Sequence, residues 1–330
     1  MTVIIANKPI GPIGFGMGGL TWPTKALPIS ESITIIKAAL NSGATMWNAG
    51  EHYGTPSYNS LHLLNAYFTQ YPDDADKVFI SVKAGFDMVQ RKPISSGQGI
   101  RDSIERCLSI LDGKCQIDLF QAGRLDPDVP IEETIGAIEE YVKVWKIRSV
   151  GLSEVSAASI RKANSIIPIA AVEVELSLFE TSVLSNGVAN TCSELGIPIV
   201  AYSPINRGFL SGQIRKFEDL PKNDYRRMFP RYQQENFGEN MKLVEEVESI
   251  ARRKGCTAVQ IGLAWGRAQG EAIRTPVIPI PGSSSRERLR ENLSLVELSE
   301  SELREINEIL ARLEVKGGRA PPGLDKYLSV

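Results

Sequence analysis

Short runs of β-branched and aromatic residues alternate along this chain with longer segments whose apolar residues recur every three or four positions. The first pattern is typical of buried strands, and the second is typical of helices that bury one face. No linker-like stretch interrupts the alternation, so we expect one domain covering residues 1–330. The predicted strands cover residues 12–17, 44–49, 78–83, 117–122, 148–153, 171–176, 199–203 and 277–280.

Between these strands lie helical segments with recognisable ends. Ser30 is expected to cap a helix that Gly43 ends, because serine favours helix starts and glycine favours helix ends. Strand and helix units in series favour a closed (β/α)8 TIM barrel, whose active site lies where the carboxyl ends of the strands meet the loops. Other predicted helices cover residues 100–111, 131–142, 183–194, 238–255 and 257–269.

Two segments break this regular spacing. About 70 residues separate the seventh predicted strand from the eighth, and the first part of that gap, 206–237, is rich in Gly, Pro, Asp and Arg. A long loop at this rim is expected to fold over a ligand. The tail, 316–330, is also rich in Gly and Pro but keeps Leu324, Tyr327 and Leu328. The sequence leaves two alternatives open for the tail, a cover over the pocket mouth or disorder.

Composition narrows the class of protein. The chain has 330 residues, of which 42% are hydrophobic and 23% are charged, as in soluble globular enzymes. Because 37 Lys and Arg balance 39 Asp and Glu, we expect neither nucleic acid nor an anionic membrane as partner. No apolar run approaches the roughly 20 residues that cross a bilayer, so we expect a cytosolic or nuclear protein. Its oligomeric state is left open.

Cysteine and histidine usage excludes several chemistries. The four cysteines form no Cys-x-x-Cys pair, so we expect free thiols and no metal site. Only two histidines, His52 and His62, are present, which disfavours hydrolase triads and most zinc enzymes. We expect His62 on a helix surface and His52 to point away from its neighbour Tyr53. The proton donor of any reaction is therefore expected to be Tyr, Lys or a carboxyl group.

A dinucleotide-binding fingerprint, Gly-x-Gly-x-x-Gly, appears at residues 14–19. That fingerprint requires a helix to begin at once and an acidic residue to end the next strand. Here Trp22 and Pro23 follow instead. We interpret these glycines as a tight turn whose backbone lies close to a ligand.

Two strand ends bring a tyrosine and a lysine together. Alternate residues of a strand share a face, so Asn48 and Lys83 are expected to point into the barrel, with Tyr53 on the loop just above Asn48. An ammonium group near a phenol lowers its pKa from roughly 10 and makes it a better acid at neutral pH. Tyr53 and Lys83 are thus a reasonable proton source for carbonyl reduction.

Several segments carry a resemblance that spans all eight strands. They are Trp47 to Gly54, Lys83, Ile117 to Gln121, Gly151 to Glu154, Val172 to Phe179, Ala201 to Gly208, and Ile280 to Ser284 with Glu291 and Asn292. In these segments the chain resembles the aldo-keto reductase family, and within it the pyridoxal reductases of fungi. The resemblance implies NADPH as cofactor, hydride transfer to a carbonyl carbon, and Tyr53 as the proton donor, with Lys83 and Asn48 beside it.

The resemblance also implies a cofactor site across the strand ends. Ser153 and Glu154 would face the carboxamide, with Glu173 where the family often has Gln, and Tyr202 would stack on the nicotinamide. The hydroxyls and the charge at the start of the helix after strand eight suit a 2′-phosphate, which favours NADPH over NADH. The remaining expected cofactor contacts are Gly16, Met17, Ser203, Pro204, Ile205, Asn206, Arg207, Gly208, Gly282, Ser283, Ser284, Arg288, Glu291 and Asn292.

Two positions depart from the family pattern. Asn48 replaces the usual Asp, and Gly123 stands where the family has His. Asn48 is expected to hydrogen-bond Lys83 without neutralising it, which leaves the full charge to act on Tyr53. Gly123 is expected to open space beside the carbonyl for a substituted pyridine ring, with Trp22 and Phe86 as aromatic walls.

The expected activity is therefore NADPH-dependent reduction of pyridoxal, or a similar aromatic aldehyde, to the alcohol pyridoxine or its analogue. The loss of both Asp and His keeps open an NADPH-binding regulatory or scaffold protein with weak catalysis. A reductase for another carbonyl compound is a further alternative. The residues that line the substrate pocket come from loops, so the sequence leaves the carbonyl unidentified.

Overall fold

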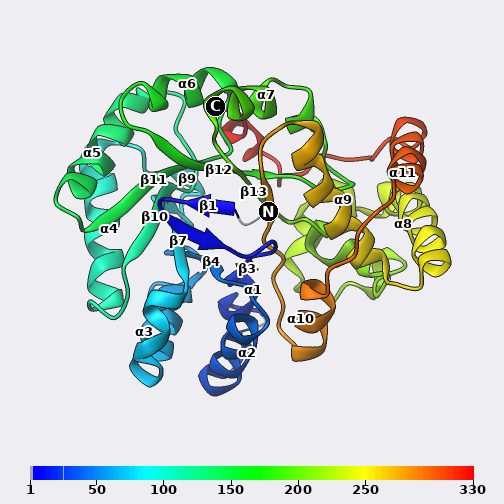
Figure 1. The fold of residues 1–330 in the computed structure, drawn as a ribbon, viewed down its shortest axis with the longest axis horizontal. Coiled ribbons are helices and arrows are strands. Elements are labelled where there is room, and N and C mark those ends of the chain that lie inside the picture. Colours follow the sequence, from blue (N-terminus) through cyan, green and yellow to red (C-terminus); the bar gives the residue numbers. More distant parts are fainter. Residues whose placement is uncertain (1–2, 25) are drawn as a thin grey trace.

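The computed structural model describes residues 3–24 and 26–330 of the chain. Eight parallel strands form its central sheet, in the order β3, β4, β7, β10, β11, β12, β13, β14. Figure 1 shows the sheet at the centre of the molecule with helices around it. A parallel bridge from Gly16 to Gly282 joins the first strand to the segment after the last, so the predicted (β/α)8 barrel is confirmed. The strands are β3 (Phe15–Gly16), β4 (Met46–Gly50), β7 (Phe79–Ala84), β10 (Ile117–Ala122), β11 (Ile147–Ser153), β12 (Ile169–Glu175), β13 (Ile199–Tyr202) and β14 (Val277–Pro279).

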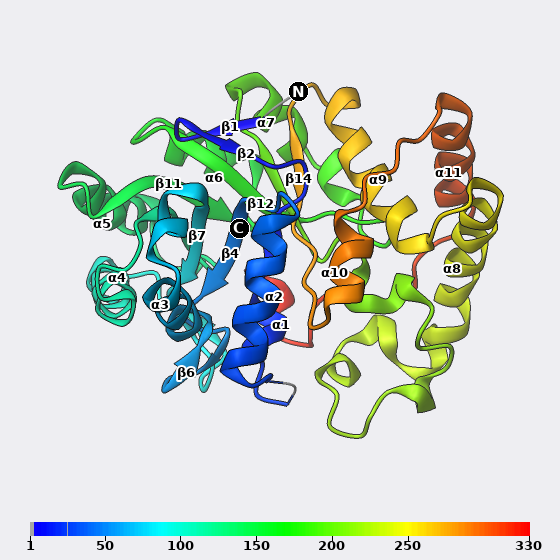
Figure 2. The same ribbon diagram turned by 60° about the horizontal axis from the view of Figure 1, so that its bottom comes forward.

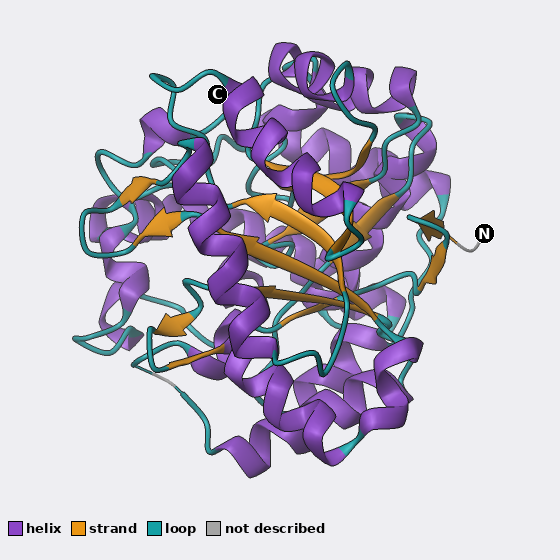
Figure 3. Ribbon diagram, turned by 90° about the vertical axis from the view of Figure 1, so that its left-hand side faces the viewer, coloured by secondary structure: helices purple, strands orange, loops and turns teal. Residues whose placement is uncertain are grey.

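Helices surround this barrel, and Figure 3 shows them on both sides of the strands. Every residue of β4, β7 and β10 is buried, because one face of each strand packs on these helices and the other lines the interior. The helices are α1 (Gly18–Thr21), α2 (Ile29–Asn41), α3 (Ser60–Gln70), α4 (Gly97–Leu111), α5 (Ile131–Lys143), α6 (Ala157–Asn164), α7 (Val188–Leu195), α8 (Gln234–Lys254), α9 (Ala258–Ala272), α10 (Arg286–Leu293) and α11 (Glu300–Arg312). No helix in the described part of the chain combines the length and apolarity that a membrane span requires.

An N-terminal hairpin that the sequence analysis did not predict lies across one opening of the barrel (Figure 1). It consists of β1 (Val3–Ile5) and β2 (Lys8–Ile10), paired antiparallel. Ile5 and Ile10 are buried in one cluster with inward residues of the barrel strands. Lys8 donates a hydrogen bond to the carbonyl of Val78, just before β7, so the hairpin covers the amino ends of the strands. Two further hairpins, β5 (Gly54–Thr55) with β6 (Tyr58–Asn59) and β8 (Phe86–Asp87) with β9 (Lys92–Pro93), follow β4 and β7.

Two helix predictions were wrong in detail. Helix α2 begins at Ile29 with Pro28 as its cap, so Ser30 lies inside the first turn. The segment 183–194 is a short 3₁₀ turn, η2 (Ser182–Leu184), and then α7, because Gly187 between them has a φ of +91° that a helix cannot hold.

The long gap and the tail both fold onto the carboxyl ends of the strands. The gap forms the short 3₁₀ helices η3 (Asn206–Ser211), η4 (Phe217–Asp219), η5 (Tyr225–Met228) and η6 (Pro230–Tyr232), and Figure 2 shows them in yellow-green below α8. In the tail, η7 (Asp325–Tyr327) buries Tyr327. The backbone amides of Ser156 and Ser329 donate to the carbonyls of Val330 and Glu154 respectively. Of the two alternatives for the tail, the structure shows an ordered segment at the rim.

Candidate active site

Four strands present polar side chains to one point inside the barrel. Lys83 on β7 is in register with Gln121 on β10, and Asn48 on β4 is in register with Ser81 on β7. Glu173 reaches the same point from β12. All five residues are buried, and they sit near the carboxyl ends of their strands, where the chemistry of such barrels is placed.

Lys83 and Glu173 form an ion pair at the centre of this group. Lys83 Nζ lies 2.5 Å from Glu173 Oε1, and the two side chains are 6% and 1% exposed. The prediction that Lys83 keeps an unneutralised charge is therefore wrong. Glu173, which was expected to contact the cofactor, binds this lysine instead.

Asn48 contacts the carboxylate and not the lysine. Its Nδ2 donates to Glu173 Oε2 at 2.8 Å and to Ser81 Oγ at 3.3 Å. Its Oδ1 accepts a bond from the Tyr53 hydroxyl at 3.4 Å. The predicted hydrogen bond from Asn48 to Lys83 is absent from the described residues, and Asn48 instead connects the carboxylate to the phenol. We call Asn48, Tyr53, Lys83, Gln121 and Glu173 the strand cluster.

The Tyr53 phenol keeps its proton in this setting. Burial raises the pKa of Tyr53 above its usual value, Lys83 lowers it, Glu173 raises it, and the overall direction is upward. The lowering by Lys83 that the sequence predicts is present, but burial outweighs it. Burial alone lowers the pKa of Lys83, whereas Glu173 and Tyr53 raise it, and the overall direction is again upward. At neutral pH the pair therefore consists of a neutral phenol and a charged ammonium, which is the donor form.

His52 fills the space beside Gly123. A Cβ at position 123 would lie 3.0 Å from His52 Cε1, so Gly123 does not open the room that was expected. The His52 ring does not point away from Tyr53, because the two rings meet edge to face with centroids 4.9 Å apart. Burial, with help from Lys83 and Arg124, lowers the pKa of His52 to about 3, so the imidazole is neutral. Its Nδ1 is buried without a hydrogen-bond partner among the described residues.

The other histidine has a structural role that the sequence analysis missed. His62 belongs to a capping box at the start of α3, in which its ring nitrogen and the Asn59 side chain bond to each other's backbone amides. It is partly buried and does not stand free on the surface. The spacing of Asn59 and His62 fits a capping box, but histidine is an unusual third residue for one.

A cavity of about 560 Å³ runs from the strand cluster toward α10. Tyr53 and Asn48 line its inner end, and Arg288, Glu291 and Asn292 line its outer end. The structure also brings the following expected cofactor contacts to this cavity: Gly16, Tyr202, Ser203, Pro204, Ile205, Arg207, Gly208, Gly282, Ser283 and Ser284. Within the part of the chain that the structure describes, no group of His, Cys, Asp and Glu is arranged to hold a metal ion.

Some expected cofactor residues do not line this cavity. Met17 is fully buried in the core, and Asn206 is buried while its carbonyl accepts a bond from Tyr232. Ser153 and Glu154 lie beyond the cavity, near Arg124 and Arg319. Most of the lining residues that sequence reasoning missed come from the long gap, and they are Ser211, Gln213, Ile214, Tyr225, Arg226 and Val259. The sequence indicated only that the long gap would fold over a ligand. No motif in the gap identified which of its residues would line the cavity.

The outer end of the cavity offers hydroxyl groups and a cation at a helix start. Ser285 caps α10 by accepting from the amide of Arg288. The Arg288 guanidinium donates to Ser284 Oγ at 3.1 Å and to Ser285 Oγ at 3.2 Å, and no carboxylate among the described residues pairs with it. An exposed, unneutralised cation among hydroxyls at a helix start fits a bound phosphate.

Trp22 and Phe86, which were expected to be aromatic walls of one substrate pocket, lie in different places. Trp22 lines the cavity and lies 5.4 Å from the Tyr225 ring, so it covers the cofactor-sized space. Phe86 lies 6.0 Å from the His52 ring and does not line the cavity. The two residues therefore do not form facing walls of one pocket.

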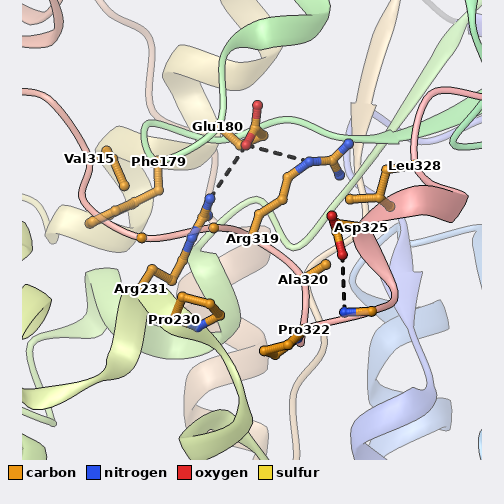
Figure 4. Close-up of a pocket in the computed structure, with 13 residues that line it drawn as sticks. Phe179, Glu180, Pro230, Arg231, Val315, Arg319, Ala320, Pro322, Asp325 and Leu328 are labelled. Carbon is orange, nitrogen blue, oxygen red and sulfur yellow. Dashed lines mark hydrogen bonds and ion pairs between the residues drawn. The ribbon is translucent and has the colours of Figure 1, made fainter.

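A second group of charges surrounds the tail at the rim. Arg319 donates to Glu154 at 2.6 Å and to the Tyr202 hydroxyl at 3.3 Å. Arg319 and Arg231 both approach Glu180, as the dashed lines in Figure 4 show, and both also approach Glu175. We call Glu154, Glu175, Glu180, Arg207, Arg231 and Arg319 the rim cluster. The rim cluster lies beside a cavity of about 660 Å³ under the tail (Figure 4). Within this cluster the Glu154 carboxylate, which was expected to face the carboxamide, accepts a hydrogen bond from Arg319 instead.

Arg124 lies at this rim without a carboxylate partner. Its guanidinium donates to the carbonyl of Gly123, to Ser153 Oγ at 3.3 Å and to the Tyr202 hydroxyl at 3.4 Å. No described carboxylate lies within ion-pair distance of it. Arg124 therefore forms no close ion pair with a described carboxylate, although its charge helps to lower the pKa of Glu154.

The chain is similar to known proteins in sequence and in fold. The model of the Aldo/keto reductase family matches residues 12–311. A probable pyridoxal reductase 2 of Schizosaccharomyces pombe is 39% identical over 336 aligned positions, covering 99% of each chain. An aldo-keto reductase of the same yeast, whose name specifies NADP(+), is 36% identical and covers 97% of this chain and 94% of its own. The glycerol dehydrogenase of Gluconobacter oxydans shares the fold with a TM-score of 0.81, at 23% identity over 94% of this chain and 95% of its own.

Proposed function

This chain belongs to the aldo/keto reductase family, and from that premise we propose that it reduces pyridoxal, or a similar aromatic aldehyde, to the alcohol with NADPH. One observation carries the proposal. A neutral phenol, Tyr53, lies at the inner end of the cavity of about 560 Å³, and the charged Lys83 lies next to its ring.

The residues of the strand cluster supply the proton. When bound, NADPH would supply the hydride. Tyr53 donates the proton of its hydroxyl to the carbonyl oxygen, and the ammonium of Lys83, 5.2 Å from the ring centre, stabilises the negative charge that the phenol takes on. Lys83 is buried and Tyr53 is partly buried, which limits the access of water and strengthens this electrostatic effect.

The residues at the outer end of the cavity support NADPH as the cofactor. Arg288, Ser283 and Ser284 would hold the 2′-phosphate, since together they offer a positive charge and hydroxyl donors at the start of α10. Tyr202 presents its side chain to the cavity near Lys83 and would stack on the nicotinamide. The name of the related yeast enzyme, which specifies NADP(+), supports the same choice.

Arg124 favours pyridoxal over a plain aldehyde. The ring hydroxyl of pyridoxal, next to the aldehyde, is an acidic phenol that carries negative charge near neutral pH. A guanidinium that lacks a carboxylate partner and lies beside Ser153 and Tyr202 would attract that charge. The name of the relative at 39% identity, a probable pyridoxal reductase, points the same way.

The test is consumption of NADPH with pyridoxal, compared with a panel of simple aldehydes, by the native protein and by Tyr53→Phe. We expect Tyr53→Phe to lose at least about 100-fold in turnover while NADPH still quenches the protein's fluorescence. Near-native turnover by this variant would contradict the role of the phenol. Tight NADPH binding with no turnover of any carbonyl would instead establish the alternative, a cofactor-binding regulatory protein.

A further inference from the structure

We propose that the tail, residues 316–330, is a latch on the cavity of about 560 Å³, and that closure of the tail and binding of the dinucleotide favour each other. The tail reaches this cavity by two routes. One runs through the long gap, and the other runs through Arg319, a positioning residue for Tyr202. The inference rests on the proposed function for NADPH as the ligand of the cavity.

The tail is fastened near its two ends and crosses the rim between them. At its start, the backbone amide of Lys316 donates to Asn240 Oδ1 at 2.8 Å. At its end, the backbone amide of Ser329 donates to the carbonyl of Glu154 at 2.9 Å. Between these points the tail borders the cavity of about 660 Å³ (Figure 4). A segment that borders a cavity buries little surface there, so it opens at a lower cost than the whole fold.

The first route begins where the tail contacts the long gap. Gly317 has a φ of +83°, and a Cβ at this position would lie 2.5 Å from the backbone nitrogen of Arg231. Only glycine allows the two backbones to come this close. Asn240, buried on α8, donates to the carbonyls of Arg231 and Lys316, each at 2.9 Å. One side chain therefore fastens the tail and the gap together.

The same part of the gap is bonded to the wall of the cavity of about 560 Å³. Tyr232, which follows Arg231 in η6, donates its hydroxyl to the carbonyl of Asn206. The next two residues, Arg207 and Gly208, line the cavity. Asn206 and Arg207 have φ values of +44° and +50°, a costly conformation that neighbouring contacts must hold. We therefore expect a shift of η6 to reach the residues that would meet the dinucleotide.

The second route is the side chain of Arg319. It donates to the Tyr202 hydroxyl at 3.3 Å and to Glu154 at 2.6 Å. Tyr202 lines the cavity, and its ring centre lies 5.3 Å from Lys83 Nζ. Arg124 donates to the same hydroxyl at 3.4 Å. Two guanidinium groups thus hold Tyr202 in place, and one of them leaves when the tail opens.

The coupling must be reciprocal. If closure of the tail tightens binding of the dinucleotide by some factor, the bound dinucleotide favours closure by the same factor. We expect a factor of at least about 10, within the usual range for two coupled sites. The effect can therefore be measured on the tail and, independently, on the cofactor.

The first experiment measures the tail of the native protein. Trypsin must bind the Arg319 side chain to cleave after it, and the closed tail holds that side chain against Glu154. We expect saturating NADPH to slow cleavage after Arg319 by at least about 10-fold, as followed by mass spectrometry. Cleavage of a small chromogenic peptide controls for an effect of NADPH on trypsin. Equal cleavage after Arg319 with and without bound NADPH would overturn the proposal.

The second experiment opens the tail without changing a charge. In Gly317→Ala the new methyl group would lie within 3 Å of the backbones of Pro230 and Arg231. We expect NADPH to leave this variant at least about 10-fold faster, as measured by stopped-flow fluorescence after mixing with excess NADP+. Gly323→Ala is the matched control, since Gly323 also has a φ of +83° but a Cβ there would meet no described atom within 4 Å.

The two glycine variants carry the same backbone strain, and only one of them carries the clash. Native-like release of NADPH from Gly323→Ala and faster release from Gly317→Ala would support the latch. If trypsin cleaved Gly317→Ala faster after Arg319 while NADPH left it at the native rate, the tail would open without effect on the cofactor and the proposal would fail.

The positioning role of Arg319 has its own readout. In Arg319→Gln we expect KM for NADPH to rise about 10-fold while kcat does not fall, because the strand cluster is unchanged. Arg253→Gln is the control for loss of an ion pair, since Arg253 pairs with Glu305 on α11, and its KM for NADPH should stay native. A fall in kcat at unchanged KM in Arg319→Gln would contradict positioning of Tyr202.

This proposal and the proposed function fail in different ways. If NADPH bound and slowed cleavage after Arg319 but the protein reduced no carbonyl compound, the proposed function would fail and the latch would stand. If NADPH bound and supported turnover but left that cleavage unchanged, the latch alone would fail.

Discussion

The strand cluster and the rim cluster both pair buried opposite charges, but they differ in the number of partners and in the elements that supply them. In the strand cluster one lysine meets one carboxylate at 2.5 Å, and every charged member comes from a strand. In the rim cluster Glu175 is approached by Arg207, Arg231 and Arg319 at 3.3 to 3.6 Å, and these arginines come from the long gap and the tail. The strands fix a single pair, whereas the long gap and the tail supply three arginines that share Glu175, and one of them, Arg319, also pairs with Glu154 at 2.6 Å. The arrangement of the strand cluster suits a proton-transfer site, and the arrangement of the rim cluster suits attachment of the long gap and the tail to the barrel.

Lys83→Met should give the largest effect, because it breaks the ion pair between β7 and β12 and leaves Glu173 buried without its counter-charge. We expect turnover to fall by about 100-fold or more and the free energy of unfolding to fall by about 3–5 kcal/mol. Stopped-flow or steady-state NADPH oxidation and urea denaturation would measure these losses. Near-native stability in this variant would show that the two clusters tolerate charge loss equally.

Arg319→Ala should have a smaller effect on stability, since the rim cluster shares its contacts. The pKa of Glu154 is raised by burial but lowered by Arg319 and Arg124, and the overall direction is downward. The ion pair therefore stabilises the fold above the usual pKa of Glu and loses this effect as pH falls. We expect a loss of about 1–3 kcal/mol at pH 7 that shrinks below about pH 4.5. Denaturation at both pH values, with proteolysis of the tail, would test it.

Arg124→Gln tests whether the guanidinium beside the rim cluster recognises the ring hydroxyl of the substrate. Because this cation has no carboxylate partner, we expect KM for pyridoxal to rise about 10-fold, a loss of about 1.4 kcal/mol. Pyridine-4-carbaldehyde keeps the pyridine ring and the aldehyde but lacks the ring hydroxyl, together with the methyl and hydroxymethyl groups, so its KM should change little. An equal rise for both aldehydes would mean that Arg124 supports the fold of the rim and does not select an anion.

His52→Phe should have the smallest effect. Its lowered pKa means that native His52 takes up a proton on unfolding between about pH 3 and pH 6.5, which destabilises the native protein as pH falls through that range. The variant should therefore gain stability relative to native at pH 5 and differ little at pH 8. Turnover at pH 7 should stay within about 3-fold of native, and a 100-fold loss would assign His52 a part in proton transfer.

The sequence was sufficient for the barrel because its strands are buried runs bounded by clear turns. The predicted strand 117–122 matches β10 at both ends, and β7 and β11 differ from their predictions by one residue. Tyr53 and Lys83 could also be placed, since strand alternation fixes which side chains point inward. The hairpin β1 to β2 was missed because a pair of three-residue strands carries too little periodicity.

The partner of Lys83 could not be found in this way. Glu173 lies three strands away and reaches the lysine across the barrel interior, a contact that depends on barrel closure and not on any local pattern. The filling of the space at Gly123 by His52 has the same origin, because that contact joins the loop after β4 to the end of β10. Local spacing was enough to predict the strands and helices. The contacts between side chains of distant strands depend on closure of the sheet, which local spacing does not reveal.

The hairpin at the amino ends of the strands has a kinetic consequence. Ile5 and Ile10 cover that end of the barrel, so cofactor and carbonyl must both enter and leave through the opposite rim. We expect the dinucleotide, which would lie along the cavity from Tyr53 to Arg288, to fill that entrance before the carbonyl, so the two reactants would exchange in a fixed sequence. Product inhibition should therefore follow a compulsory-order pattern, with the dinucleotide binding first and departing last.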